Sequence, residues 1–381
     1  MANNPRLGQK RVRPREIMIL GGAYISYGVG ASFGTGIALL QYHGALGLWG
    51  ILSQLISCVL TITLIYLVSK DCGDYGLKDM NRMFIHYCGP YLGRFFRWFT
   101  VVMLFLFTGT MFAGAAETFN TSYGIPLPVG TLIMLAAVII TVILGAKKLI
   151  DIIGNIAPII LVGMLIICVY SLIFHSDSLI EGSKLLIESC KDIRMTGSPV
   201  LSGVLEFGLV IVMTTGYLAS VSGRQGTSKK ELLIGNVSGE GSLFLIKIML
   251  IFVFILNAST IIGSSVPIVL LGDKLGSVFG KIYALILELA IYTTAAGMAW
   301  QVVANVVPEK NKLYKPLCAV ITLAAYGFTY LGPFSTLMMW VNTLSSYVGV
   351  VFIIALLYTR IFRHKKMQKV SDEPADTTAE A

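Results

Sequence analysis

A run of glycines inside the first apolar segment is the feature best suited to ligand binding. The segment, from about Ile17 to Tyr42, is long enough to cross a bilayer as a helix, and it contains Gly28-Val29-Gly30-Ala31-Ser32-Phe33-Gly34-Thr35-Gly36. Each glycine in a helix interior costs about 1 kcal/mol relative to alanine. Irregular backbone at membrane depth is tolerated only where protein or a water-filled cavity satisfies its polar groups. The run therefore predicts a broken helix whose N–H and C=O groups face a ligand, which is typical of transporters.

A broken helix offers two kinds of backbone group to a solute in mid-membrane. The N-terminal end of a half-helix carries free N–H groups and suits a carboxylate. The C-terminal end carries free C=O groups and suits Na⁺. We therefore expect a small zwitterionic or organic solute, and we assign its backbone contacts to Gly30, Ala31, Ser32, Phe33 and Gly34.

A second weak helical segment occurs in the sixth apolar span, from Val212 to Gly223. Paired interruptions in corresponding positions of two halves indicate a midplane binding site. We expect a second break here, with Gly216, Tyr217 and Ala219 facing the first, and with Tyr217 or Phe33 as a gate. The alternatives are a polar helix face packed on its neighbours and, for the two aromatic residues, ordinary core packing.

Two adjacent threonines in the eighth span have the spacing of a cation site. On a helix, the Ala290 carbonyl and the hydroxyls of Thr293 and Thr294 converge on one patch. Two carbonyls from the break in span one would bring the set to about five oxygens, close to the number that a hard cation takes. This pattern predicts Na⁺ as a coupling ion. The alternative is that the threonines only bond carbonyls of their own helix.

Charged residues within the spans favour proton coupling as the rival mechanism, because intramembrane charge is expensive and usually functional. Glu206 in span six and Glu288 in span eight are the candidates for a proton or charge relay. Glu288 lies about three turns from the end of its span and could bind a proton or a substrate amine, or be a buried structural acid. Glu240 and Lys247 share a face of span seven and could pair.

Composition indicates an integral membrane protein. The 381 residues are 55% hydrophobic and 13% charged, against about 25% charged in soluble domains. The formal net charge of +9 comes mainly from tails and short loops, so no nucleic-acid partner is expected. The six cysteines form no C-x-x-C motif, and metal-ligand clusters, nucleotide motifs and catalytic constellations are lacking. We therefore expect no enzyme activity and no cofactor other than Na⁺ as a possible ion.

Ten transmembrane spans can be counted, and basic residues concentrate on one side of them. This asymmetry predicts a multi-pass protein of the inner (plasma) membrane with both termini in the cytoplasm. A basic tail, 1–16, precedes one transmembrane domain, 17–361, and a cytoplasmic tail, 362–381, is expected to be disordered. The spans lie near 17–43, 47–69, 96–118, 127–145, 149–174, 200–222, 231–257, 277–306, 315–332 and 334–361.

Three connecting segments stand out. Residues 71–95 are expected to form a cytoplasmic loop, and 175–199 an external segment with a short amphipathic run at 179–189. Residues 258–276, with Pro267 in the middle, are read either as a lid that dips into an external vestibule or as a loop that rests on helix ends.

Ten spans divide into two halves of five, at about 17–174 and 200–361. Because five crossings are an odd number, the second half starts from the opposite side and is inverted relative to the first. The predicted fold class is therefore an all-α polytopic membrane protein with a five-plus-five inverted repeat and broken helices one and six.

These residues resemble the amino acid–polyamine–organocation superfamily, which has the LeuT-type fold, and within it the YkvI-like bacterial membrane proteins. The run from Val29 to Gly36, followed by Gln41-Tyr42, is similar to a family run of the form V-G-A-G-F-A-S-G-Q-E. A second motif is Tyr292-Thr293-Thr294-Ala295-Ala296-Gly297. The family's polar Gln-Glu pair is Ile37-Ala38 here, so any role of that acid is lost.

The resemblance implies a secondary transporter for an amino acid or related solute. In LeuT-type sodium symporters a sodium site is formed by helix eight and two carbonyls before the break in helix one. By position these residues would be Ala290, Thr293, Thr294, Ser26 and Val29. Proton-coupled relatives carry a lysine on helix five, and span five here, 149–172, has none, which favours Na⁺. A proton-coupled transporter, or a nutrient receptor of the spore-germination type, remains the alternative, and the oligomeric state is left open.

Overall fold

The fold is all-helical in a computed structural model that describes residues 12–28, 31–77, 80–144, 156–222, 228–307 and 311–362. No strand occurs among these residues, and the helices follow the ten predicted spans. The elements are α1 (Pro14–Gly28), α2 (Ala31–Gly34), α3 (Ile37–Tyr42), η1 (Gly44–Leu46), α4 (Trp49–Tyr75), α5 (Met80–Tyr123), α6 (Leu127–Leu144), α8 (Ile156–Ile173), α9 (Leu179–Ser189), α10 (Pro199–Ser222), α11 (Lys229–Leu256), α12 (Ala258–Ile261), α13 (Pro267–Leu275), α14 (Ser277–Val306), α15 (Tyr314–Phe328), η2 (Thr329–Leu331) and α16 (Phe334–Phe362).

Helix length and apolarity confirm a polytopic membrane protein. Among the described residues, α4, α5, α11, α14 and α16 are each long and apolar enough to cross a membrane, and α6, α8 and α10 carry shorter apolar stretches. Large apolar side chains are exposed along these helices, including Val59 on α4, Val162 on α8 and Ile354 on α16. Such exposure suits a lipid environment, in which outward-facing side chains are apolar.

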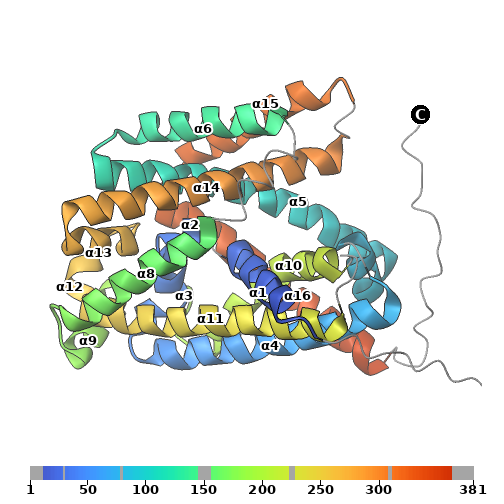
Figure 1. Cartoon of the computed structure of the whole chain (residues 1–381), viewed down its shortest axis with the longest axis horizontal. Coiled ribbons are helices and arrows are strands. Elements are labelled where there is room, and N and C mark those ends of the chain that lie inside the picture. The colour runs from blue at the N-terminus through green and yellow to red at the C-terminus, as the bar shows by residue number, and fades with distance from the viewer. Residues whose placement is uncertain are drawn as a thin grey trace, which may run out of the picture.

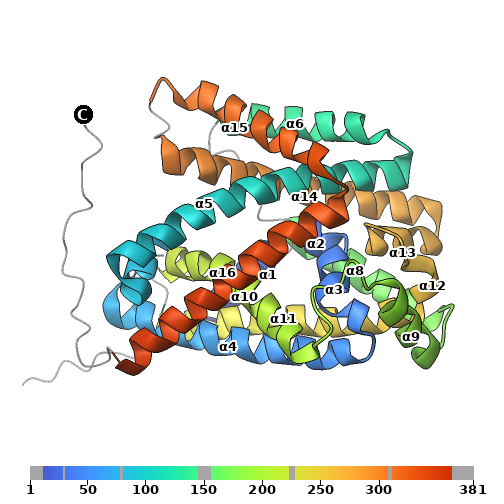
Figure 2. The ribbon, with the colours of Figure 1, turned by 180° about the vertical axis from the view of Figure 1, so that it is seen from behind.

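The helices pack in two groups. In the first, α4 packs on α10 and α11, and α11 also packs on α1. In the second, α5 packs on α14 and α6, and α6 packs on α15. The two views show the first group along one side of the molecule and α6, α14 and α15 along the other (Figures 1 and 2). We call them the α4–α11 group and the α5–α14 group.

The molecule has two ends, which we name by what lies there. At the α9–α13 end, the carbonyl of Leu256 accepts a hydrogen bond from the N–H of Ser176, and Asp177 accepts one from Ser259. At the opposite end, which we call the Arg13 end, Arg13 forms an ion pair with Glu231 of α11 at 3.0 Å. Helices α4 and α10 start at the α9–α13 end, and α1 and α11 start at the Arg13 end.

α16 connects the two groups, because it packs on both α10 and α5. Its backbone meets that of α10 at a pair of glycines. A Cβ on Gly349 would lie 1.8 Å from the carbonyl oxygen of Gly208, and a Cβ on Gly208 would lie 2.3 Å from the carbonyl oxygen of Ser346. Since no Cβ fits at such distances, glycine is required at both positions for this approach.

Helix one is interrupted as predicted. The first segment, α1, ends at Gly28, and two short segments, α2 and α3, follow on either side of Gly36, whose φ of 86° suits glycine. The carbonyl of Thr35 accepts a hydrogen bond of 3.0 Å from the N–H of Ile268 at the start of α13. Val29 and Gly30 lie outside the described residues.

Helix six, in contrast, is continuous, and the prediction of a second broken helix is wrong for the backbone. α10 runs without interruption from Pro199 to Ser222. One polar residue of the expected break bonds its own helix, since the Thr215 hydroxyl donates to the Ile211 carbonyl at 2.5 Å. Small and polar residues here form a helix face rather than a break.

The segment 71–95 is not a loop. α4 extends to Tyr75, and α5 begins at Met80 and bends at Gly89, where φ is 74°, just before Pro90. Met83, Phe84 and Tyr87 are buried on one face of the first part of α5. The Tyr87 hydroxyl donates to Asp71 at 2.7 Å. This apolar spacing supports a helix, which the surrounding charged residues and glycines conceal in the sequence.

The other two connecting segments contain the helices that their patterns indicate. The amphipathic run 179–189 is α9, which is capped by Ser178 through the N–H of Glu181. In 258–276, Pro267 begins α13. The side chains of Ile268, Val269 and Leu271 are fully buried. With its hydrogen bond to Thr35, this segment packs onto the interrupted helix.

Candidate functional site

One stripe of α14 faces the interrupted helix. Tyr283, Leu287, Ala290 and Thr294 recur at spacings of four, three and four residues and so share a face. The Tyr283 hydroxyl donates to the carbonyl of Gly34 at 2.9 Å. A Cβ on Gly34 would lie 2.3 Å from a methyl carbon of Leu287, so glycine is what allows the close approach.

The stripe continues beyond this contact. Ala290 and Thr294 follow Leu287 along the same face of α14, about one and two turns further on. Val29 and Gly30, which belong to the predicted sites in the break, lie outside the described residues.

The predicted ion ligands on α14 lie close together, and one pair is already bonded. Thr293 is buried, and its hydroxyl donates to the Ala290 carbonyl at 3.0 Å. This is the bond that the alternative interpretation expects, and a donating hydroxyl still has lone pairs for a cation. Thr294 is half-buried. Ser26 lies in α1, but its side chain is not among those described.

The predicted substrate contacts are split between two locations. Phe33 and Gly34 are buried in α2 beside α14, with the Gly34 carbonyl taken by Tyr283, and the backbone of Ala31 and Ser32 is helical. Gly216 and Ala219 lie within the continuous α10. Their backbone groups therefore belong to a helix and do not form a second half-helix terminus.

Tyr217 contacts α1. Its ring lies edge-on to Tyr24, with centroids 5.8 Å apart, and its hydroxyl is 3.4 Å from the Leu20 carbonyl. Phe33 is 7% exposed. The two aromatic residues that were candidates for a gate are both packed in this structure.

A buried charged cluster joins α10 and α11, and we call it the Glu206 cluster. The Lys247 Nζ lies 2.8 Å from Glu206 Oε1, and His43 Nε2 lies 2.9 Å from Glu206 Oε2. His43 Nδ1 lies 2.9 Å from the Ser53 hydroxyl of α4. Exposure is 7% for Glu206, 9% for Lys247 and zero for His43. The cluster therefore links the turn after helix one to α4, α10 and α11.

The pairing of Lys247 differs from the expectation. Lys247 forms its direct ion pair with Glu206 on the neighbouring helix, not with Glu240 seven residues before it. Glu240 is 4% exposed, and it accepts a hydrogen bond of 2.8 Å from the Tyr24 hydroxyl of α1. Sequence spacing finds residues on the same helix face but cannot show which neighbouring helix that face meets.

His43 was not singled out from the sequence. A signal was available, because ionisable residues inside a span are rare and mark functional positions by default. His43 follows Gln41-Tyr42 at the end of span one, where it could be taken for a loop residue. In the structure it is buried, between α3 and η1.

Glu288 lies on the side of α14 opposite to the Tyr283–Thr294 stripe, since its helical position is displaced by more than a quarter turn from every residue of that stripe. Its own face includes Lys281, whose carbonyl accepts from Tyr123 of α5, and Tyr292, whose hydroxyl meets Thr141 of α6. Glu288 is 4% exposed, and within the described part of the chain neither carboxylate oxygen has a hydrogen-bond partner. It is thus an acid of the α5–α14 group and not of the interruption.

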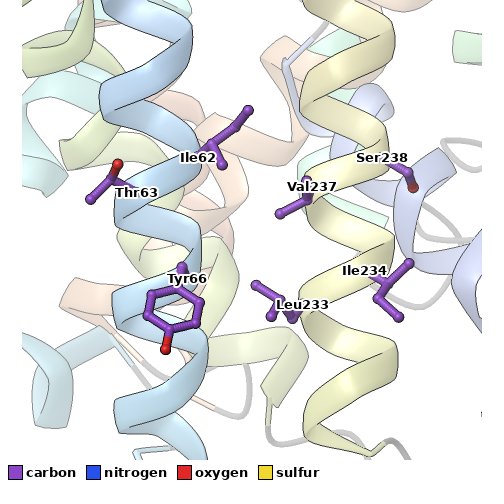
Figure 3. A pocket seen from close by; sticks show the side chains of 7 residues that line it. All are labelled: Ile62, Thr63, Tyr66, Leu233, Ile234, Val237 and Ser238. Carbon is purple, nitrogen blue, oxygen red and sulfur yellow. The ribbon is translucent and has the colours of Figure 1, made fainter.

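A groove on the α4–α11 group lies apart from both features. It has a volume of about 570 Å³ and runs between α4 and α11, with Ile62 and Tyr66 on one side and Leu233 and Val237 on the other. Figure 3 shows these side chains between the two helices. The lining is apolar apart from Thr63, Ser238 and the Tyr66 hydroxyl, as expected for a surface between two membrane-spanning helices.

Comparison with known proteins supports the fold. No protein-family model matches the chain. It is 25% identical over 358 residues to the uncharacterized membrane protein YkvI of Bacillus subtilis (strain 168), covering 90% of this chain and 96% of the relative.

Two solved structures share the arrangement of helices. Mhp1 in an inward-facing conformation matches with a TM-score of 0.58 and 14% identity, covering 90% of this chain and 77% of that one. A manganese transporter of Eremococcus coleocola matches with a TM-score of 0.50 and 15% identity, covering 90% and 78%. At these identities the likeness concerns the fold, and it confirms the predicted LeuT-type arrangement.

Proposed function

We propose that this chain is a secondary active transporter for a small solute, an amino acid or related zwitterion, coupled to Na⁺. The observation that carries the proposal is the interruption of helix one opposite the Tyr283–Thr294 stripe of α14. Broken helices at mid-membrane supply unpaired backbone groups to solutes and ions in transporter folds. The manganese transporter that shares the arrangement of helices supports a transport role.

The solute would bind at the interruption. Gly30, Ala31, Ser32, Phe33 and Gly34 would provide backbone contacts. Tyr217 would close the site from the α10 side by leaving its contact with the Leu20 carbonyl, which at 3.4 Å is a weak hydrogen bond. Gly216 and Ala219 would give the solute room along α10 without offering free backbone groups.

Na⁺ would bind between α14 and the end of α1. The Ala290 carbonyl, the hydroxyls of Thr293 and Thr294, and the carbonyls of Ser26 and Val29 would provide five oxygens, close to the coordination number of a hard cation. The Thr293 hydroxyl oxygen and the Ala290 carbonyl oxygen are already 3.0 Å apart. Na⁺ would accept lone pairs from both atoms without breaking their hydrogen bond.

Alternating access would follow from the two helix groups. The α4–α11 group would rock against the α5–α14 group around the site. The protein would lie in the plasma membrane with both termini in the cytoplasm, as the distribution of basic residues predicts.

The test is thermal stabilisation of the purified, detergent-solubilised protein. Single amino acids and related solutes are added in Na⁺ and, separately, in K⁺, because a ligand that binds the native state raises Tm by mass action. A solute that stabilises only in Na⁺ supports the proposal. Stabilisation that is equal in Na⁺ and K⁺ would contradict sodium coupling.

Substitution of one ligand localises the ion. Thr294→Ala is expected to abolish the Na⁺-dependent part of the shift and to leave expression intact. Thr322→Ala is the control, because Thr322 is a threonine of α15 outside the proposed site, and its hydroxyl bonds its own helix at the carbonyl of Cys318. Unchanged sodium dependence in Thr294→Ala, or equal losses in both variants, would remove the ion site.

A further inference from the structure

We propose that the Glu206 cluster is a proton-binding site, with His43 as the group that gains and loses the proton. This inference goes beyond the proposed solute and Na⁺ site, since it concerns a different ion and a different face of the bundle. It rests on the geometry and the charge count of His43, Glu206, Lys247 and Glu240.

The charge count leaves one negative charge in excess. Glu206 and Glu240 contribute two negative charges when ionised, and Lys247 contributes one positive charge. The two acids are close enough to interact electrostatically, and both interact with Lys247. An uncompensated charge buried in a membrane protein is strongly unfavourable. One additional proton makes the cluster neutral.

The other titratable groups that face the cluster are neutral in their usual forms, so they leave the count unchanged. Tyr24 of α1 donates to Glu240, and Tyr217 of α10 packs on Tyr24. Cys58 of α4 lies within electrostatic range of Glu206, Glu240 and Lys247. Tyr42 of α3 lies within range of Glu206, and its hydroxyl pairs with Ser346 of α16 at 2.6 Å.

His43 is placed to take the proton. Its Nε2 lies 2.9 Å from Glu206 Oε2, the carboxylate oxygen that Lys247 does not contact. Its Nδ1 lies 2.9 Å from the Ser53 hydroxyl, which can donate to a neutral imidazole or accept from a protonated one. Each ring nitrogen therefore lies 2.9 Å from a polar oxygen that suits either protonation state. Imidazole is also the side chain whose charge ordinarily changes between pH 5 and 8.

A proton fits this site better than a metal cation. The Lys247 ammonium is 2.8 Å from Glu206 and would repel a second cation there. The position opposite Glu206 Oε2 is filled by an imidazole nitrogen, whereas Na⁺ prefers several oxygens. The protonated form would tie the turn after helix one to α10, and loss of the proton would leave excess negative charge between them.

The experiment uses protons as the only ligand. The full-length protein is reconstituted in liposomes on a solid-supported membrane, and pH jumps between 5 and 8 are applied in K⁺ buffers without Na⁺ and without added solute. Wild type is expected to give a transient charge displacement. His43→Gln, which keeps a hydrogen-bond donor but cannot be protonated, should reduce its amplitude at least fivefold. His175→Gln, at an exposed histidine between α8 and α9, should leave it unchanged.

A second variant, which keeps His43, tests the proposal even if His43→Gln does not fold. Glu240→Gln removes the excess negative charge, so His43 should hold its proton less tightly, and the midpoint of the displacement should move to lower pH. Absence of a displacement in wild type, full amplitude in a folded His43→Gln, or a midpoint in Glu240→Gln that stays fixed or rises would each overturn the proposal. Because Na⁺ and solute are absent, none of these results bears on the sodium site.

Discussion

Glu206 and Glu288 are both acids inside membrane-spanning helices, and they are almost equally buried, with exposures of 7% and 4%. Their surroundings differ completely. Glu206 has Lys247 and His43 within 2.9 Å, whereas within the described residues neither oxygen of Glu288 has a partner. The free-energy cost of an ionised carboxylate is tolerable at Glu206, which has charged and polar neighbours, and prohibitive at Glu288. Burial alone therefore does not tell what an intramembrane acid does.

The two helix groups differ in the same respect as these two acids, namely in whether buried charges have partners. The α4–α11 group contains a set of charges that must stay balanced, and its members come from α10, α11 and the turn after helix one. The α5–α14 group has at Glu288 an acid that we expect to be neutral. Glu240 of α11 has intermediate surroundings, because among the described residues it accepts a hydrogen bond from Tyr24 but forms no direct ion pair. Substitutions at the three acids or their partners should thus follow an order of decreasing effect.

The largest loss of stability is expected from Lys247→Met. Removing the ammonium leaves Glu206 as an uncompensated buried charge, and breaking a buried ion pair in this way costs about 3–5 kcal/mol. Thermal unfolding in detergent should show a large fall in Tm, and the double variant with Glu206→Gln should recover part of it. Lys281→Met, at an exposed lysine of α14, is the control. Equal Tm values for the two single variants would contradict the comparison.

An intermediate effect is expected from Tyr24→Phe. This change removes the Tyr24 hydroxyl, which donates to Glu240 and also hydrogen-bonds Thr214 of α10. Hydrogen bonds to charged groups contribute about 1.5–3 kcal/mol. The same unfolding assay measures it, with Tyr91→Phe as a control because Tyr91 is 88% exposed. A loss as large as that of Lys247→Met would mean that Glu240 depends on Tyr24 as strongly as Glu206 depends on its ion pair.

The smallest effect is expected from Glu288→Gln. The amide has the shape of the neutral acid, so the free energy of unfolding should change by about 1 kcal/mol or less. Glu206→Gln should cost more, because it leaves Lys247 unpaired. If Glu288→Gln destabilises the protein more than Glu206→Gln, then Glu288 is ionised and has a counter-charge outside the described residues.

Much of the fold is predictable from the sequence, because spans and breaks are local properties. Apolar length places the ten spans, the glycines from Gly28 to Gly36 predict the interruption of helix one, and the amphipathic run 179–189 predicts α9. The helical segment at Met83 to Tyr87 is missed, since its apolar residues are surrounded by charged residues and glycines.

The site is less predictable, because its contacts depend on how helices face each other. The polar residues near Thr215 are compatible both with a break and with a helix face, and only the backbone decides between them. The pairing of Lys247 with Glu206 joins residues 41 positions apart on different helices. His43 lies beside Ser53 and Glu206, and its sequence neighbourhood indicates neither contact.

The glycine contact between α10 and α16 has a mechanical consequence. Gly208 lies nine residues from the start of α10 and 14 from its end, and Gly349 lies near the middle of α16. The two backbones touch there with no room for a side chain between them. Each arm of α10 is about 14–21 Å long at 1.5 Å per residue. If α10 tilts against α16 in the proposed transport cycle, this contact would be the pivot, and a tilt that opens one end of the bundle would close the other.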